Sequence, residues 1–239
     1  MLSDAQINEF AERGFLLIPQ VVADDVLARA ADRIDDLVAT DPPPAGTRGP
    51  HFYFLPTKDE PALRAPLTRT PAFKLAEQLT GPGTLPYPWQ VQVALNIPPY
   101  PHRPGRPHID AANPEPTNGP IRGTFTLLAG ILMTDQRTEN SGNLWIWPGT
   151  HLTHAEYFRT NGPHQHCAYP PIDLPEPEQI KGRAGDLFLA HYLLGHNIGG
   201  NDTPNKTRRA LYYRLSTHAH PTHRADSLQA PWLDYTPIT

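Results

Sequence analysis

The chain of 239 residues has a formal net charge of −4 at pH 7 and includes 30 prolines, 17 glycines, 12 histidines and one cysteine. This length fits one domain of mixed or all-β type, and the scattered arginines argue against a nucleic-acid partner. A single cysteine excludes an intrachain disulfide, and the lack of a long apolar run argues against a membrane span, so we expect one cytoplasmic domain over residues 1–239.

The first part of the chain, mainly residues 1–83, predicts helices with strand insertions. Ser3 followed by Gln6 is a capping-box signature and Gly14 is a stop signal, so a short amphipathic helix is expected between them. "FLLIPQVV" and "HFYFLP" predict strands, and "ADDVLARAADRIDDLVATD" between them has the helical period. Residues 60–81 predict one or two proline-initiated helices that stop at the final glycine of that stretch.

The rest of the chain, mainly residues 84–217, is dominated by strand-like runs separated by turn-forming stretches. These runs are "PWQVQVALNIP", "GTFTLLAGILMTD", "GNLWIWPG", "GDLFLAHYLL" and "RRALYYRLS". Segments between them that favour a helix, such as "HAEYFRT", are short, so an antiparallel double sheet or jelly roll is favoured over parallel β-α-β winding. The predicted fold class is therefore α+β, mainly β with helices.

A histidine and an aspartate two residues apart, His108 and Asp110, lie in a stretch too rich in proline and glycine for a helix. If this stretch is extended, both side chains point to the same face and can enter the mouth of a barrel. The best third ligand is His196 at the end of an apolar strand, with His191 as its competitor. Two imidazoles and one carboxylate form the facial triad of non-haem Fe(II) oxygenases, which leaves coordination positions open.

Four segments occur in the order typical of one enzyme family. "FAERGFLLIPQVV" is similar to that family's opening helix and strand, "PHIDA" to its HxD element, and "SGNLWIWPGTH" to its "G-x-L-x-x-x-PGSH" turn. "GDLFLAHYLLGHNIGGNDTPNKTRRA" is similar to its distal segment, although "HNI" replaces the usual His-Gly-Ser. The chain therefore resembles the phytanoyl-CoA dioxygenase family of Fe(II)/2-oxoglutarate-dependent oxygenases.

The resemblance implies a double-stranded β-helix, a cupin-like jelly roll, whose core is buttressed by the N-terminal helices. It selects His196 rather than His191 as the third ligand, so that His108, Asp110 and His196 are the metal-binding and catalytic residues. It also implies Fe(II) as cofactor and 2-oxoglutarate and O₂ as co-substrates, with 2-oxoglutarate converted to succinate and CO₂.

Arg208 is the residue expected to hold the remote carboxylate of 2-oxoglutarate, because an arginine fork suits a carboxylate better than a lysine does. On a regular strand Arg208 and Arg209 face opposite ways, and the face of Arg208 is expected toward the ligand. A slip of one residue, or a bulge, would exchange the two faces. Further candidate contacts for the co-substrate are Gln92, Asn96 and Thr126.

We expect a dioxygenase that hydroxylates a small molecule. Alternatives within the family are a desaturase, an epoxidase or a cyclase of natural-product biosynthesis, whereas Asp110 disfavours a halogenase because that chemistry replaces the ligand carboxylate with a small residue. An alternative of another class is a metal-binding cupin-like module without oxygenase activity, which has no need for Arg208. Substrate identity and oligomeric state do not follow from the sequence.

Other histidines and aromatic residues are interpreted more simply. The pairs His151 and His154, and His164 and His166, predict solvated surface rather than a second metal site. The tract "HAHPTH" at 218–223 is explained equally well as a His-rich tract that binds metal adventitiously and as a solvated C-terminal turn. Cys167 has no indicated activating partner and is interpreted as a non-catalytic thiol. Aromatic side chains that line either a substrate pocket or the barrel core are Phe52, Phe54, Tyr100, Trp145 and Trp147.

Overall fold

The computed structural model describes residues 1–110, 121, 123–163 and 169–236, and His164, His166 and Cys167 lie outside these ranges. Its first part contains α1 (Asp4–Arg13), β1 (Phe15–Ile18), α2 (Asp24–Thr40), β2 (Gly49–Pro56), α3 (Pro61–Thr68) and α4 (Ala72–Thr80). The remainder contains β3 (Gln90–Ile97), β4 (Leu127–Leu132), β5 (Leu144–Ile146), α5 (Thr150–Asn161), β6 (Glu178–Gln179), β7 (Leu187–His191), β8 (His196–Ile198), β9 (Arg208–Leu215), the 3-10 helix η2 (His220–Thr222) and α6 (Arg224–Gln229).

The predicted signals at the ends of the N-terminal helices are confirmed. Ser3 caps α1 through a reciprocal capping box with Gln6, and Gly14 ends that helix in the left-handed conformation with φ 80°. Pro61 lies in the first turn of α3, where its missing N–H costs nothing, and α4 ends at Gly81. These local sequence signals therefore locate both ends of α1, the start of α3 and the end of α4.

Several elements differ from the prediction. Helix α5 is longer than "HAEYFRT" suggests, since it begins at Thr150 directly after Gly149. Strand β8 and helix α6 had not been predicted; a strand of three residues is too short to show a periodicity. None of the described helices has the length and apolar character needed to cross a bilayer.

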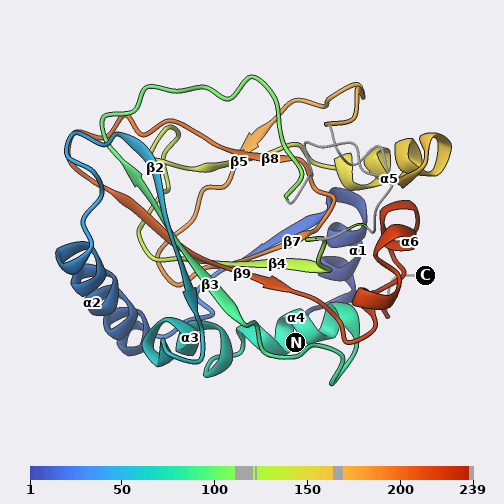
Figure 1. Ribbon diagram of the computed structural model, residues 1–239, viewed down its shortest axis with the longest axis horizontal. Coiled ribbons are helices and arrows are strands. Elements are labelled where there is room, and N and C mark those ends of the chain that lie inside the picture. Colours follow the sequence, from blue (N-terminus) through green and yellow to red (C-terminus); the bar gives the residue numbers. More distant parts are fainter. Residues whose placement is uncertain (111–120, 122, 164–168, 237–239) are drawn as a thin grey trace.

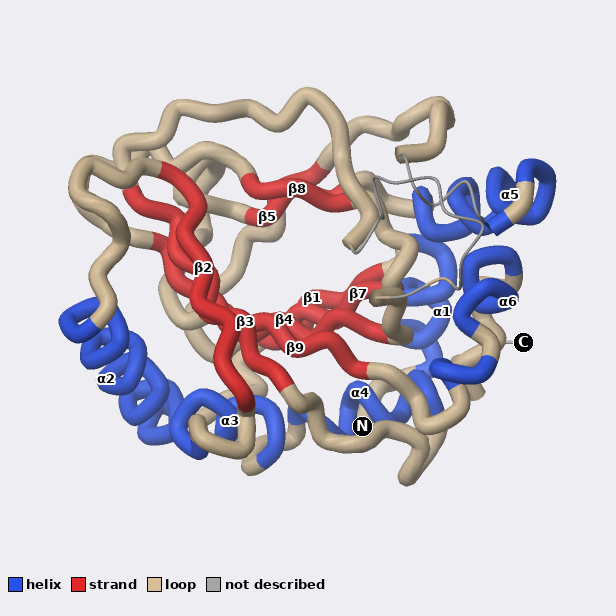
Figure 2. The backbone as a smooth tube through the Cα atoms, in the orientation of Figure 1, coloured by secondary structure: helices blue, strands red, loops and turns tan. Residues whose placement is uncertain are grey.

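The described strands form two sheets that face each other (Figures 1 and 2). The major sheet has the order β1-β7-β4-β9-β3-β2 and the minor sheet the order β6-β5-β8. Every pairing between these strands is antiparallel. The fold is therefore the expected double-stranded β-helix, or jelly roll.

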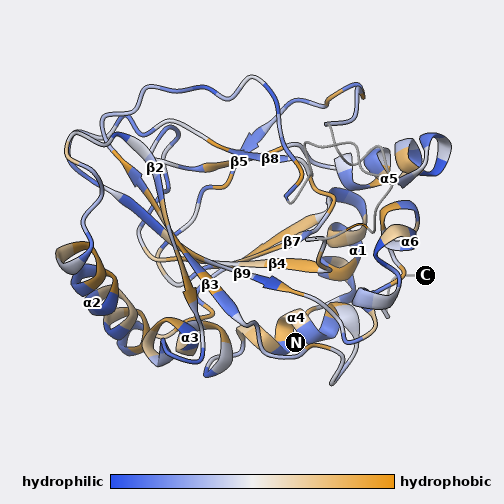
Figure 3. Cartoon of the chain, viewed as in Figure 1, coloured by the Kyte–Doolittle hydropathy of each residue, from blue (hydrophilic) through white to orange (hydrophobic). Residues whose placement is uncertain are grey.

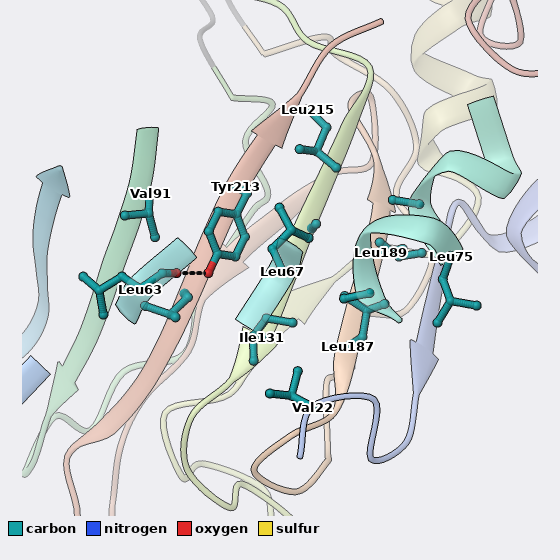
Figure 4. Packing of buried hydrophobic residues seen from close by; sticks show 14 of the residues in the cluster. Val22, Leu63, Leu67, Leu75, Val91, Ile131, Leu187, Leu189, Tyr213 and Leu215 are labelled. Atoms are coloured by element: carbon teal, nitrogen blue, oxygen red, sulfur yellow. Dashed lines mark hydrogen bonds between the residues drawn. The ribbon is translucent and has the colours of Figure 1, made fainter. Parts of the chain in front are cut away.

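The two faces of the major sheet have different roles. Leu211, Tyr213 and Leu215 of β9 belong to a hydrophobic core that also contains residues of α1 to α4. The Tyr213 hydroxyl donates to the carbonyl of Leu63 on α3 (Figure 4), and the apolar stripes of the helices are seen in Figure 3. Each fully buried leucine of this kind stabilises the fold by about 1.5–3 kcal/mol. The N-terminal helices thus buttress one face, and the other face lines the barrel interior.

Candidate active site

Three side chains with metal-binding atoms converge in the barrel: His108, Asp110 and His196. The Oδ1 atom of Asp110 lies 3.4 Å from Nε2 of His108 and 3.4 Å from Nε2 of His196. One carboxylate oxygen therefore lies at equal distance from two imidazole nitrogens. This arrangement brings together the three residues that the sequence had selected.

Backbone pairing fixes these side chains. His108 and His196 form an isolated antiparallel bridge, in which the N–H of each residue donates to the carbonyl of the other. His196 opens β8, which is held in the minor sheet by β5. The carbonyl of Asp110 accepts a hydrogen bond of 2.9 Å from the Tyr192 hydroxyl. The ligand atoms are thus positioned by main-chain contacts from separate parts of the chain.

The donor set fits a divalent transition metal. Nδ1 of His196 lies 2.9 Å from the carbonyl of Leu194, to which it donates, so the lone pair of Nε2 is directed into the site. Two neutral imidazoles and one carboxylate with coordination positions left open are the preferred set of non-haem Fe(II). The residues present therefore fit an Fe(II) ion.

The charges at the site favour an ionised carboxylate. Burial acts to raise the pKa of Asp110, but the hydrogen bonds from His108 and His196 and the charge of Arg214 hold that pKa well below its usual value. Burial and the neighbouring His196 lower the pKa of His108. Burial also opposes the charged form of His196, but its contact with Asp110 raises the pKa of this imidazole. Asp110 is consequently ionised at neutral pH.

A cavity of about 300 Å³ opens beside the three ligands. Aromatic and aliphatic side chains make up six of its eleven lining residues, and the other five are polar or charged. The lining residues are Phe52, Phe54, Gln92, His108, Asp110, Leu128, Leu144, His196, Ile198, Tyr212 and Arg214. Of the aromatic residues left ambiguous by the sequence, Phe52 and Phe54 line this cavity, and Trp145 and Trp147 are buried elsewhere.

The predicted register of β9 is confirmed. Arg208 is 3% exposed and lies on the inner face, where its Nε donates to Oε1 of Gln136 at 2.9 Å and its Nη2 to the Tyr212 hydroxyl at 2.6 Å. Arg209 points to the helices, where its Nη2 lies 2.6 Å from Oδ1 of Asp35 on α2. Arg208 itself does not line the cavity; it lies behind Tyr212, which does.

The other candidate contacts for the co-substrate divide into two groups. Gln92 and Asn96 are paired with Tyr212 and Arg208 across β3 and β9, so they share the inner face. Gln92 lines the cavity, while Asn96 is buried with its Oδ1 unpartnered among the described residues. Thr126 lies outside the cavity lining, and its hydroxyl accepts a hydrogen bond of 3.1 Å from the Thr217 backbone N–H.

The sequence interpretation assigned no role to Arg214, although Arg214 shares the face of Arg208. Its Nε and Nη2 contact Oδ2 of Asp110 at 2.9 and 2.7 Å, and its Nη1 donates to Oε1 of Gln92 at 3.0 Å. Strand alternation from Arg208 would have placed Arg214 on the inner face, but the periodicity gives no indication of its carboxylate partner. No sequence pattern had indicated that Tyr192 contacts Asp110 or that Gln136 contacts Arg208.

His191 lies away from the three ligands. It is buried on the helix side of the major sheet, where its Nε2 donates to the carbonyl of Pro231 at 2.7 Å and its ring stacks on Tyr235. The interpretation of His151 and His154 as solvated surface is wrong, because both are fully buried. Nε2 of His151 lies 3.1 Å from the carbonyl of Ala11 on α1, and the ring nitrogens of His154 contact the Leu193 carbonyl and the Tyr169 hydroxyl at 2.7 and 2.8 Å. This long-range packing had no sequence signature.

A second histidine and aspartate cluster lies at the C-terminal end, and it shows that part of "HAHPTH" is buried rather than solvated. Asp234 accepts hydrogen bonds from Nδ1 of His220 at 2.6 Å and from Nε2 of His223 at 3.0 Å. The Thr217 hydroxyl donates to the same carboxylate at 2.5 Å, and Nε2 of His220 contacts the Thr124 hydroxyl at 3.0 Å. Three hydrogen bonds hold the carboxylate, and we call this cluster the C-terminal latch. Its three titratable side chains also bring potential metal-ligand atoms within 4.8 Å of one another.

Sequence comparison identifies one family. The model of the family described as phytanoyl-CoA dioxygenase (PhyH) matches residues 10–210, which contain all three converging ligands and Arg208. No curated protein sequence matches the chain.

Solved structures with the same fold include those of the proteins SnoN, HygX and SnoK. The α-ketoglutarate-dependent epimerase SnoN of nogalamycin biosynthesis has 21% identity and a TM-score of 0.62, over 89% of this chain and 81% of SnoN. HygX from Streptomyces hygroscopicus, with nickel and 2-oxoglutarate bound, has 14% identity and a TM-score of 0.60, over 91% and 88%. The carbocyclase SnoK of nogalamycin biosynthesis has 18% identity and a TM-score of 0.53, over 93% and 90%.

Proposed function

The chain belongs to the phytanoyl-CoA dioxygenase family of Fe(II)/2-oxoglutarate-dependent oxygenases, and on this premise we propose that it hydroxylates a small molecule, with Fe(II) held by His108, Asp110 and His196. Bound Fe(II) would couple the decarboxylation of 2-oxoglutarate by O₂ to oxidation of the substrate. The protein's own part is to position the reactants and to exclude water from the cavity.

The observation that carries the proposal is the position of one Asp110 oxygen, 3.4 Å from both histidine Nε2 atoms. Donor atoms that share one metal ion lie about 3 Å or more apart, and the two separations of 3.4 Å meet that requirement. The carboxylate is also held ionised, which is the form that binds a metal. Geometry and charge therefore support the same ligand set.

Arg208 is proposed to hold the remote carboxylate of 2-oxoglutarate. It is a buried cation on the inner face, and Nε and Nη2 are the atoms that hold Gln136 and Tyr212. A carboxylate that reached past Tyr212 would exchange the phenol contact for a charge-assisted one, which is roughly twice as strong. Gln92 and Asn96 share this face and are proposed as further polar contacts, whereas the position of Thr126 gives it no direct contact in this proposal.

The cavity lining supports a substrate with an apolar or aromatic body. Phe52, Phe54 and Ile198 lie on its walls, and the guanidinium of Arg214 is neutralised by Asp110. Burying an apolar molecule against such walls is favourable, whereas an unpaired charge would be desolvated without compensation.

We place the protein in the cytoplasm, where the reducing environment suits a ferrous enzyme.

Desaturation, epoxidation or cyclisation is the second candidate outcome at the same metal. SnoN and SnoK, which share the fold, are an epimerase and a carbocyclase. Small differences in substrate placement decide between such outcomes, since all begin with oxidation at one substrate position. Mass spectrometry separates the gain of one oxygen atom, by hydroxylation or epoxidation, from the loss of two hydrogen atoms, by desaturation or oxidative cyclisation. NMR spectroscopy of the product then distinguishes the two reactions within each pair.

The deciding experiment is anaerobic addition of Fe(II) and then 2-oxoglutarate to the metal-free protein. We expect a visible charge-transfer band when the keto-acid chelates the metal, followed by release of succinate on admission of O₂. A protein that binds Fe(II) but develops no band and releases no succinate would instead be the metal-binding cupin-like module. The Arg208→Ala variant serves as a matched control, because it should retain the metal and need more 2-oxoglutarate.

A further inference from the structure

Arg214 makes an unusual contact beside the proposed iron site. Its Nε and Nη2 both donate to a single oxygen of Asp110, Oδ2, at 2.9 and 2.7 Å. The other oxygen, Oδ1, is the one that lies 3.4 Å from each histidine nitrogen. The guanidinium thus occupies one carboxylate oxygen and leaves the other toward the histidines.

We propose that Arg214 is a positioning residue that holds Asp110 as a ligand through one oxygen only. This inference rests on the proposed metal site. A carboxylate that chelates through both oxygens takes two coordination positions, whereas 2-oxoglutarate and O₂ need the positions that a facial triad leaves open. Because its Nε and Nη2 atoms occupy Oδ2, Arg214 prevents Asp110 from taking a second coordination position on the metal, which the co-substrates require.

The orientation of Arg214 is itself built into the barrel. Its Nη1 donates to Oε1 of Gln92 at 3.0 Å, and its guanidinium carbon lies 5.8 Å from the centre of the Phe125 ring. Leu128 is its cross-strand neighbour on β4. Gln92 therefore binds the nitrogen of the guanidinium that does not contact Asp110, and the guanidinium lies over the Phe125 ring. Both contacts help to hold Nε and Nη2 toward Asp110. A lysine has the charge but no planar fork and cannot make the same set of contacts.

The competing role for Arg214 is direct binding of an anionic ligand in the cavity, since its side chain is 31% exposed. The two roles differ in what happens without any ligand. A positioning residue acts on the metal alone, whereas a residue that binds an anion affects only the affinity for that anion. Metal binding in the absence of 2-oxoglutarate therefore separates them.

The test uses Co(II) as the probe, because its visible absorption reports coordination number and geometry. Co(II) is titrated into metal-free wild type and the variants Arg214→Met, Arg214→Lys and Gln92→Leu, without 2-oxoglutarate. We expect Arg214→Met to change the visible spectrum of bound Co(II) toward a higher coordination number, because Oδ2 of Asp110 is then free to bind the metal together with Oδ1. Arg214→Lys should restore only part of the wild-type spectrum, and Gln92→Leu should show a smaller change of the same kind.

Arg209→Met is the matched control, because it removes an arginine–carboxylate pair from the same strand on the opposite face. It should bind Co(II) with the wild-type affinity and spectrum. A wild-type Co(II) spectrum in Arg214→Met would overturn the inference while leaving the metal site intact. If Arg214→Met failed to fold, an unchanged spectrum in both Arg214→Lys and Gln92→Leu would overturn it equally. Wild-type Co(II) binding in the His196→Ala variant would instead refute the metal site itself.

Discussion

His108 and His196 exchange both of their backbone hydrogen bonds, at 2.9 and 3.1 Å, although they are far apart in the sequence. Their rings lie with centres 4.5 Å apart, and both face Oδ1 of Asp110. The two imidazoles are therefore placed by a main-chain bridge that needs no metal to form. This relationship explains why side-chain replacement should remove the metal and spare the fold.

We expect His108→Ala, Asp110→Ala and His196→Ala each to lower Fe(II)-dependent turnover by at least about a hundredfold, because loss of a ligand exceeds the effect of an outer partner. Succinate release at saturating Fe(II) measures this, and circular dichroism should show retained folding. His218→Ala, at an exposed position, is the control and should match wild type. Full turnover in His196→Ala would show that the third ligand is misassigned.

Arg208→Ala should raise the dissociation constant of 2-oxoglutarate by at least about tenfold, since a charge-assisted contact contributes roughly 1.5–3 kcal/mol. Fe(II) binding should be unchanged. Arg209→Ala, which loses only its pair with Asp35 on the helix side, should bind 2-oxoglutarate like wild type. Anaerobic titration of the charge-transfer band gives both constants, and the opposite ranking of the two variants would contradict the assignment.

The buried histidines predict a loss of stability in acid. Burial lowers the pKa of His151 to about 3, and of His154 and His191 to about 4 each. These groups stay neutral in the folded protein while the unfolded chain takes up protons below its pKa of about 6.5, so the free energy of unfolding falls as pH drops from about 6.5 toward 4. With all three groups the slope reaches about 4 kcal/mol per pH unit.

Urea unfolding at a series of pH values measures that slope. His154→Gln removes one titrating group and should make the slope shallower by about 1.4 kcal/mol per pH unit, whatever its effect on stability at pH 7. An unchanged slope in this variant would mean that His154 takes up its proton equally in the folded and unfolded states.

The latch at Asp234 predicts a localised weakness at the C-terminal end. Burial alone would raise the pKa of this carboxyl, but hydrogen bonds from His220 and Thr217 lower it to about 2. The stabilisation is thus present above the unfolded pKa near 4 and is lost as pH falls toward 2. Asp234→Asn should lower the free energy of unfolding by about 3 kcal/mol at pH 7, because it breaks a buried charged network.

Chemical denaturation and limited proteolysis test this prediction, with early cleavage expected near residues 218–236. Asp226→Asn is the matched control, because Asp226 is exposed on α6. Equal stability of the two variants would show that the latch contributes little.

The sequence by itself determined what depends on neighbours along the chain. The capping box of Ser3 and Gln6, the glycine that ends α1 and the proline that begins α3 are local rules, and the structure confirms them. The alternation of side chains along β9 correctly separated Arg208 from Arg209, because a strand without a bulge keeps a period of two. The jelly roll followed from antiparallel strand patterning together with the family motifs.

Only the tertiary structure decided what depends on contacts across the barrel. The residues alone left His191 and His196 as alternatives, and only the bridge to His108 places one of them beside Asp110. The contact of Arg214 with one oxygen of Asp110 joins β9 to the segment that carries Asp110. The periodicity of the sequence does not encode the relative position of these two segments. The sequence pattern specifies which face a side chain takes, but the partner across that face is chosen by long-range pairing of strands.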